Sequence, residues 1–283
     1  MSVRLTLICR PEASVSLAGM APAAVCPLTS DAALAFPLAE SLWPRKSRLG
    51  DWFGWDRIDD QRDDRLIVSG DLSLFDDIGA GLANGSMLID GAAGDRVGLG
   101  MSGGEIEVTG SVGDEAALAM SGGLLTIHGN AGRRLAAAFP GQRHGMTGGE
   151  VIVRGAAGDD VAPRMRRGLV AIGACGDFPG TNMRSGTLVV AGACGRFPGA
   201  NMVRGTIILA GESAPELPAT FLPGATTLPP FFPMLARRLA QLDGSGDWTD
   251  VFDGRWQVFH GDMLRAGRGE VFVRTRQARS ASK

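Results

Sequence analysis

The sequence predicts an all-β protein: a right-handed parallel β-helix, which is a solenoid of about eight coils of about 19 residues each, with a capping segment at either end. Three observations support this. Glycine makes up 42 of the 283 residues, about twice its usual share of roughly 7%, which disfavours a mostly helical chain. Short apolar segments with a period of two recur along the chain. Most of them end in glycine and continue into phrases such as GAAG, GSVG, GNAG and GACG.

Residues 1–63 are expected to form an N-terminal cap. They contain a strand-like LTLIC stretch, loops punctuated by proline, and the aromatic phrase LGDWFGWD at residues 49–56. A solenoid needs such a cap because its first repeat would otherwise leave core side chains in water.

Residues 64–211 carry the repeats. Related segments begin at residues 64, 85, 104, 123, 149, 168, 186 and 205. The residues two and four places after each start are apolar, which indicates a strand with one buried face. A unit of about 19 residues is too short for a strand, a helix and two turns. We therefore expect one coil per unit, parallel stacking of equivalent strands and right-handed winding.

A methionine lies three residues before the start of the next unit in six repeats. We expect these side chains to fill the inside of the stack rather than to bind a metal through their thioethers. They are Met101, Met120, Met146, Met165, Met183 and Met202.

The outward-facing position three places after each start changes from mixed to apolar along the chain. Glu107 and Thr126 occupy it early, and Ile152, Ala171, Val189 and Ile208 occupy it later. The later strands are therefore covered, either by the C-terminal segment of the chain or by another protein of an assembly.

Residues 212–283 are expected to form a C-terminal cap or docking segment. A proline-rich stretch is followed by a predicted helix at Met234–Leu242 and by strands near RWQVFHGD and GEVFVRT.

Charge and cysteine usage point to a cytoplasmic protein. The formal net charge is −2, so no global positive field would attract nucleic acid. No apolar run is long enough to span a membrane, and the apolar stretch near the N-terminus is too short for a secretory signal. The four cysteines lack a CxxC pair, which is typical of reduced thiols.

The metal-binding patterns HxH, HExxH and CxxC are missing from the sequence, and we expect no catalytic site in this chain. Asp76/Asp77 and Asp159/Asp160 are paired, but we do not expect them to recur on one side of several coils, which argues against a glycosidic site. Cys175 and Cys194 occupy equivalent corners. We expect buried thiols there, although the spacing also permits a disulfide or a shared metal.

Two features could contact a partner. Arg164, Arg166 and Arg167 form a basic cluster that could attract a polyanionic ligand or an acidic protein surface, or could simply be solvated. Phe178 and Phe197 lie in the related phrases FPGTNM and FPGANM, which we expect to form an edge facing a partner protein.

The repeat, together with LGDWFGWD, resembles the β-helix of the formylmethanofuran dehydrogenase C-subunit family, which is shared with the C-terminal domain of the glutamate synthase large subunit. The resemblance is strongest over residues 48–211. Members of the family are subunits of larger enzymes. In the related formyltransferase/hydrolase complex of methylotrophic bacteria, the formyl group of formyl-tetrahydromethanopterin passes to a methanofuran-type carrier and is hydrolysed to formate.

The resemblance implies a non-catalytic structural C-subunit of such a one-carbon complex. Its partners would be a B-subunit, an amidohydrolase-like A-subunit and a formyltransferase D-subunit. It implies no cofactor in this chain, with the methanofuran-type carrier, tetrahydromethanopterin and zinc bound by the partners. A glutamate synthase-like β-helix module and a carbohydrate-active β-helix enzyme are the alternatives.

Overall fold

The computed structural model describes residues 2–11, 13–35, 37–38, 48–58, 65–244, 248 and 250–275. Its helices are α1 (Pro22–Val25), α2 (Ser30–Leu34) and α3 (Phe232–Asp243), with short 3₁₀ turns η1 (Leu49–Asp51), η2 (Asp250–Phe252) and η3 (Met263–Arg265). The strands are β1 (Ser2–Leu7), β2 (Val15–Ser16), β3 (Phe53–Ile58), β4 (Arg65–Ser69), β5 (Phe75–Asp76), β6 (Ser86–Asp90), β7 (Ser102–Val108), β8 (Gly122–Ile127), β9 (Glu150–Ala157), β10 (Leu169–Cys175), β11 (Thr187–Val190), β12 (Arg204–Leu209), β13 (Leu222–Thr227), β14 (Trp256–Gly261) and β15 (Arg268–Arg274).

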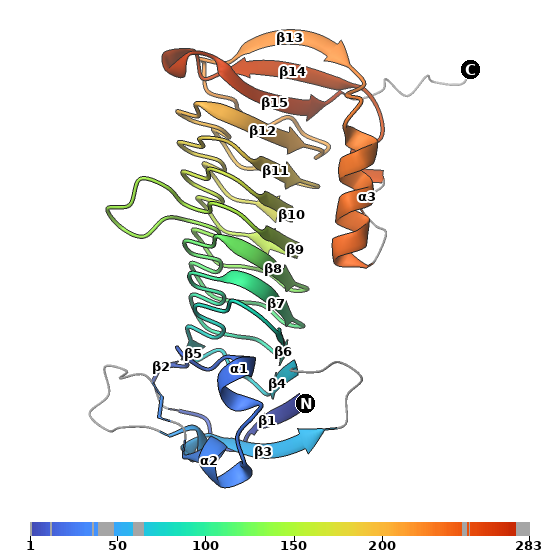
Figure 1. Ribbon diagram of the computed structural model, residues 1–283. Helices are drawn as coiled ribbons and strands as arrows, with labels where there is room; N and C mark the ends of the chain where they lie inside the picture. Colours follow the sequence, from blue (N-terminus) through green and yellow to red (C-terminus); the bar gives the residue numbers. More distant parts are fainter. Residues whose placement is uncertain are drawn as a thin grey trace.

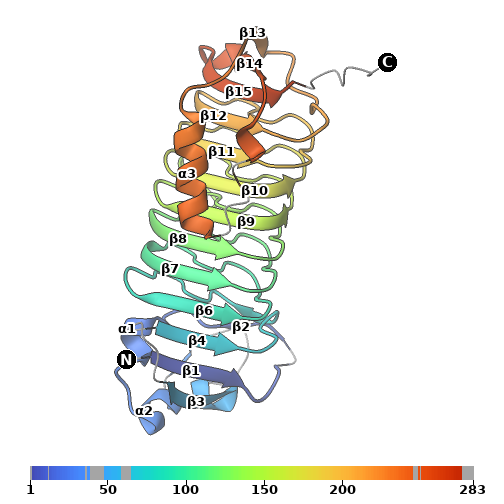
Figure 2. The same cartoon turned by 90° about the vertical axis from the view of Figure 1, so that its right-hand side faces the viewer.

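Thirteen of these strands form one sheet, in the order β13-β14-β15-β12-β11-β10-β9-β8-β7-β6-β4-β1-β3. Figures 1 and 2 show them stacked along the long axis of the molecule. From β4 to β12 all neighbours are parallel, and the pairing places Leu66 beside Met87 and Met87 beside Ile106. The apolar positions of the sequence segments therefore lie next to one another.

The prediction of a closed right-handed parallel β-helix is wrong. The sheet is mixed, because β3, β13 and β14 pair with their neighbours in antiparallel fashion. Within the described residues, the segments that return from one strand to the next hold only the two-stranded β2–β5 sheet and isolated bridges. The fold is one large, mostly parallel mixed sheet with irregular return segments.

The backbone of the return segments explains why they do not form further sheets. In the segment between β7 and β8, Glu115, Ala117 and Ala119 have φ values of 61°, 55° and 56°. Residues in this left-handed region cannot extend a strand. The side-chain pattern of the sequence shows which face a strand buries, but it does not report these dihedral angles.

The main core lies between the sheet and the return segments. The six methionines at equivalent positions are all fully buried there, which confirms their predicted packing role.

Successive return segments are held together by a series of aspartates. The Oδ1 atom of Asp76 accepts the backbone N–H of Asp95 at 2.9 Å, and Asp95 in turn accepts that of Asp114 at 2.8 Å. Asp159 and Asp177 make the same contact with the residue one repeat later, at 2.8 and 2.7 Å. The first aspartate of each pair therefore recurs from repeat to repeat and binds a main-chain donor, whereas the pair itself does not, since Arg96 follows Asp95 and Phe178 follows Asp177.

Some return segments approach so closely that only glycine fits. Gly91 has a φ of 145°, and a Cβ added there would lie 2.0 Å from the carbonyl oxygen of Gly70 in the previous repeat. Any larger residue would push the two segments apart.

The C-terminal segment of the chain covers the outer face of the later strands. Of the two predicted alternatives, the cover is therefore this chain itself and not another protein. Ile152, Ala171, Val189 and Ile208 are fully buried in a second apolar cluster with α3 side chains such as Leu239. Figure 2 shows α3 lying across β9–β12.

The predicted helix Met234–Leu242 lies within α3, and the predicted C-terminal strands are β14 and β15. Among the described residues, no helix is long and apolar enough to cross a membrane.

An ion pair fixes the end of α3 to the sheet. The Nε atom of Arg154, on β9, donates to Oδ1 of Asp243 at 2.8 Å, and Trp248 donates to the other carboxylate oxygen at 3.1 Å. The Asp243 side chain is only 1% exposed. These donors offset part of the cost of burying the carboxylate.

Arg154→Ala should lower the free energy of unfolding by about 2 kcal/mol, because it leaves the Asp243 carboxylate buried with one charged donor fewer. Guanidinium unfolding followed by tryptophan fluorescence measures this. Arg237→Ala, an exposed residue of the same helix, is the matched control and should change stability by less than about 0.5 kcal/mol. Equal effects of the two substitutions would contradict the anchoring role.

Candidate docking surfaces

The predicted arginine cluster divides between two places. Arg166 and Arg167 are exposed immediately before β10. Arg164 lies on the return segment, with a φ of 56°, and its Nη1 atom donates to the carbonyl oxygen of Gln142 at 2.8 Å. There it lines a hollow of about 410 Å³ together with Phe139 and Asp160. Arg164 is thus separated from the other two by its orientation and its partners.

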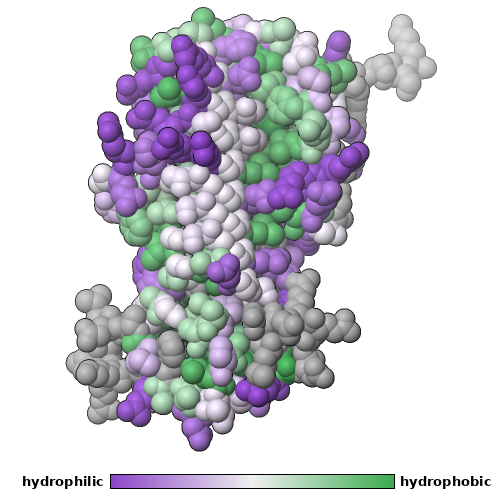
Figure 3. Space-filling model, in the orientation of Figure 1, coloured by the Kyte–Doolittle hydropathy of each residue, from purple (hydrophilic) through white to green (hydrophobic). Residues whose placement is uncertain are grey.

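Arg166 and Arg167 belong to a longer basic stripe. Arg184 and Arg204 occupy equivalent places in the next two repeats, and Arg204 pairs in register with Arg268 on β15. All five side chains are exposed, and none has an ion-pair partner among the described residues. The hydrophilic surface at the upper left of Figure 3 lies over this end of the strands. Arg166 and Arg184 lie at the same place in successive repeats, and Arg167 and Arg204 lie at the same place two repeats apart, so the stripe could have been found in the sequence.

A second column of residues runs along the return segments and changes from charged to aromatic. Its members all have φ values between 58° and 63°: Asp77, Arg96, Glu115, Arg134, Asp160, Phe178 and Phe197. Opposite charges alternate at its start, where Arg96 pairs with Asp77 at 2.6 Å and Arg134 pairs with Glu115 at 3.0 Å. Phenylalanine replaces the charge in the last two repeats.

The structure brings Phe178 and Phe197 together at the end of this column. Their ring centroids are 5.7 Å apart, and Phe178 is 39% exposed. The guanidinium of Arg196 lies 6.0 Å from the Phe197 centroid and pairs with Asp177 at 2.7 Å. Hydrogen bonds from the Arg196 side chain and backbone lower the pKa of Asp177, so this carboxylate stays charged. Exposed aromatic rings beside arginine are typical of protein interfaces.

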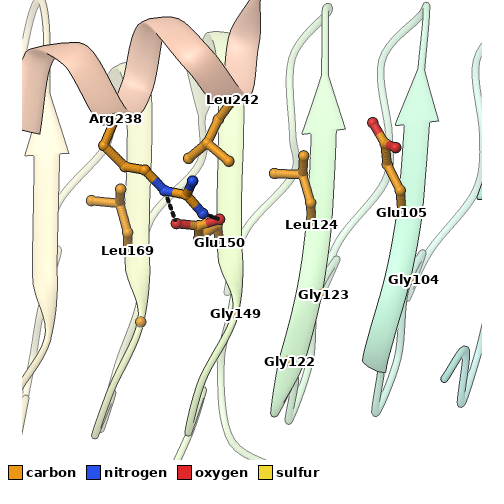
Figure 4. A pocket seen from close by; sticks show the side chains of 11 residues that line it. Gly104, Glu105, Gly122, Gly123, Leu124, Gly149, Glu150, Leu169, Arg238 and Leu242 are labelled. Atoms are coloured by element: carbon orange, nitrogen blue, oxygen red, sulfur yellow. Dashed lines mark hydrogen bonds and ion pairs between the residues drawn. The ribbon is translucent and has the colours of Figure 1, made fainter. Parts of the chain in front are cut away.

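A groove on the outer face of the sheet was not predicted. It has a volume of about 590 Å³ and continues beyond the end of α3. Figure 4 shows Glu105, Leu124, Glu150 and Leu169 along successive strands, with glycines below them and Arg238 and Leu242 of α3 above. The four strand residues share the first outward position of their segments. That pattern is visible in the sequence, but the position of α3 is not.

Cys175 and Cys194 face each other across an isolated bridge as free thiols. Their sulfur atoms are 3.7 Å apart. The hydrogen bond between the two thiols and burial both raise the pKa of Cys194, which keeps its thiol protonated. Among the described residues, no group of three or more His, Cys, Asp or Glu side chains is placed to hold a metal ion.

The comparisons with known proteins show which solved structure this chain is similar to. No protein-family model matches the chain, and no curated protein matches it. It is similar to a chain in the X-ray crystal structure of the formyltransferase/hydrolase complex (FhcABCD) from Methylorubrum extorquens in complex with methylofuran. The two chains are 34% identical, with a TM-score of 0.86, and the match covers 96% of this chain and 100% of that chain.

The raised pKa of Cys194 predicts slow alkylation. Because the thiolate is the reactive form, iodoacetamide at pH 8 should modify the exposed Cys9 at least about tenfold faster than Cys194. Peptide mapping by mass spectrometry over time measures both rates, and labelling in guanidinium shows that both peptides are detected. Equal rates in the folded protein would contradict the protonated, shielded state of Cys194.

Proposed function

We propose, from the premise that this chain belongs to the family of formyltransferase/hydrolase complex subunits, that it is the structural C-subunit and has no active site of its own. The observation that carries the proposal is the 34% identity over 96% of this chain and the whole of the neighbouring chain. The match also confirms the family resemblance drawn from the sequence.

The proposed complex moves a formyl group from formyl-tetrahydromethanopterin to a methanofuran-type carrier and releases formate. The neighbouring structure, which holds methylofuran, supports a carrier of this kind. Zinc and the reacting groups would be held by an amidohydrolase-like A-subunit and a formyltransferase D-subunit, with the B-subunit completing the assembly. This chain would hold its partners in fixed relative positions, since the continuous hydrogen-bonded sheet resists bending.

Two surfaces are proposed as contacts with a partner or with the carrier. The aromatic edge of Phe178 and Phe197 offers apolar area beside Arg196, a combination common among residues that dominate binding energy. The stripe that includes Arg166 and Arg167 offers positive charge without intramolecular partners among the described residues, which suits an acidic surface or a polyanionic ligand. Arg164 could contribute from the adjoining hollow, since its other guanidinium nitrogens have no partner among the described residues.

Purification of the tagged chain from its native source should yield a stoichiometric complex. Native mass spectrometry is expected to find an amidohydrolase-like, a formyltransferase-like and a further subunit with it, because the family assembles in this way. A stable monomer recovered at physiological salt would contradict the proposal.

Replacing Arg166 and Arg167 with glutamate should weaken assembly or carrier binding about tenfold at low salt. The effect should be smaller at high salt, because dissolved ions screen the attraction between exposed charges. The dissociation constant of the reconstituted complex measures this effect. Arg4→Glu combined with Arg237→Glu changes the net charge equally at exposed positions away from the stripe and is the matched control. If both double variants assemble as the wild type does, the stripe is only solvated surface.

A further inference from the structure

The site that receives α3 is repeated on the sheet beyond the end of the helix. Along the first outward position, acid and leucine alternate from strand to strand: Glu105 on β7, Leu124 on β8, Glu150 on β9 and Leu169 on β10. Register pairing places Leu124 between the two glutamates. The first half of this column, Glu105 and Leu124, therefore has the same residue types as the second half, Glu150 and Leu169.

Helix α3 occupies only the second half. Arg238 holds Glu150 with two hydrogen bonds of 2.7 and 2.8 Å. Leu242, four residues later and thus on the same face of the helix, lines the groove above Glu150, on the side toward Leu124. Glu150 thus receives an arginine from α3, and a leucine one turn later covers the sheet next to that ion pair.

The first half has the same groups, but no cation for its acid among the described residues. Among the described residues, no cation lies within ion-pair distance of Glu105, although it is only half-buried and lines the groove. The next acid along its strand, Glu107, already pairs with Arg65 at 3.4 Å and with His128 at 3.0 Å. Leu124 is partly exposed and packs against the edge of the apolar cluster beneath α3.

We propose that Glu105 and Leu124 receive an amphipathic helix from a partner subunit, in continuation of α3. The helix presents an arginine to Glu105 and, one turn away, an apolar side chain to Leu124. The inference rests on the proposed function, because it requires partner subunits. It differs from the aromatic edge and the basic stripe in its place on the fold and in the charge that it selects.

Charge and composition favour a partner helix over the chain itself. In a second copy, Arg238 is already committed to that copy's own Glu150, and Leu242 to the groove beside it. The C-terminal residues 276–283, RQARSASK, contain arginine but no large apolar side chain for Leu124. A carboxylate and a leucine together select a segment that carries both a cation and an apolar group, and arginine can bind the carboxylate through two parallel hydrogen bonds.

Site-specific cross-linking identifies the occupant. A photo-reactive phenylalanine derivative placed at Leu124 of the tagged chain, in the complex purified intact, should cross-link to a segment of another subunit that has basic and apolar residues at helical spacing. Cross-links to a second copy of this chain, cross-links to residues 276–283, or no protein cross-link in an intact complex would each overturn the inference.

Charge reversal measures the contribution of Glu105. Glu105→Arg should weaken assembly at least about tenfold, and Glu105→Gln should have a smaller effect, since it removes charge without repelling the partner. Thermal unfolding of the lone chain should be unchanged, because the Glu105 side chain has no ion pair among the described residues to lose. Asp56→Arg, an exposed acid on β3, is the matched control and should assemble normally.

The outcome separates this inference from the proposed function. If the wild-type chain forms no complex, the proposed function fails. If the wild-type complex forms and Glu105→Arg assembles with unchanged affinity, only the docking of a helix at Glu105 and Leu124 is overturned.

Discussion

Close main-chain contact between successive return segments is the constraint on which the rest of the structure depends. Equivalent glycines bond directly to one another: the N–H of Gly110 donates to the carbonyl oxygen of Gly91 at 3.0 Å, and that of Gly129 donates to Gly110 at 3.0 Å. A Cβ on Gly110 would lie 2.6 Å from the Gly91 oxygen. Because no side chain fits between the segments, each repeat is fixed in register on the one before it.

Fixed register turns equivalent residues into columns, and each column has its own chemistry. The buried methionines form the inner column. The aspartates that start with Asp76 form another, in which side chains bind main-chain donors of the next repeat. Burial raises the pKa of Asp76, whereas hydrogen bonds from Arg196 lower that of Asp177. A column can thus keep one geometric role while its electrostatic environment changes along the molecule.

Sequence periodicity was sufficient to predict what these columns bury. It indicated the strands, the methionine core and the apolar outer positions from Ile152 onward, because each follows from side-chain alternation. It was misleading about the return segments. Their course depends on left-handed residues such as Glu115 and Ala117, and charged and small residues at such positions have no distinctive signature. The helix-side groove was missed for another reason: Arg154 and Asp243, which fix α3, are 89 residues apart.

The interruptions in these columns are more informative about function than their regular parts. A regular column is satisfied within the chain, as Arg96 is by Asp77 and Glu150 is by Arg238. At Glu105 the alternation of acid and leucine continues, but none of the described residues supplies the cation that Glu150 receives. The same reasoning applies where charge gives way to the neighbouring rings of Phe178 and Phe197. In a molecule stiffened by continuous hydrogen bonding, such positions stay in place before a partner arrives. Binding there requires little ordering of the scaffold itself.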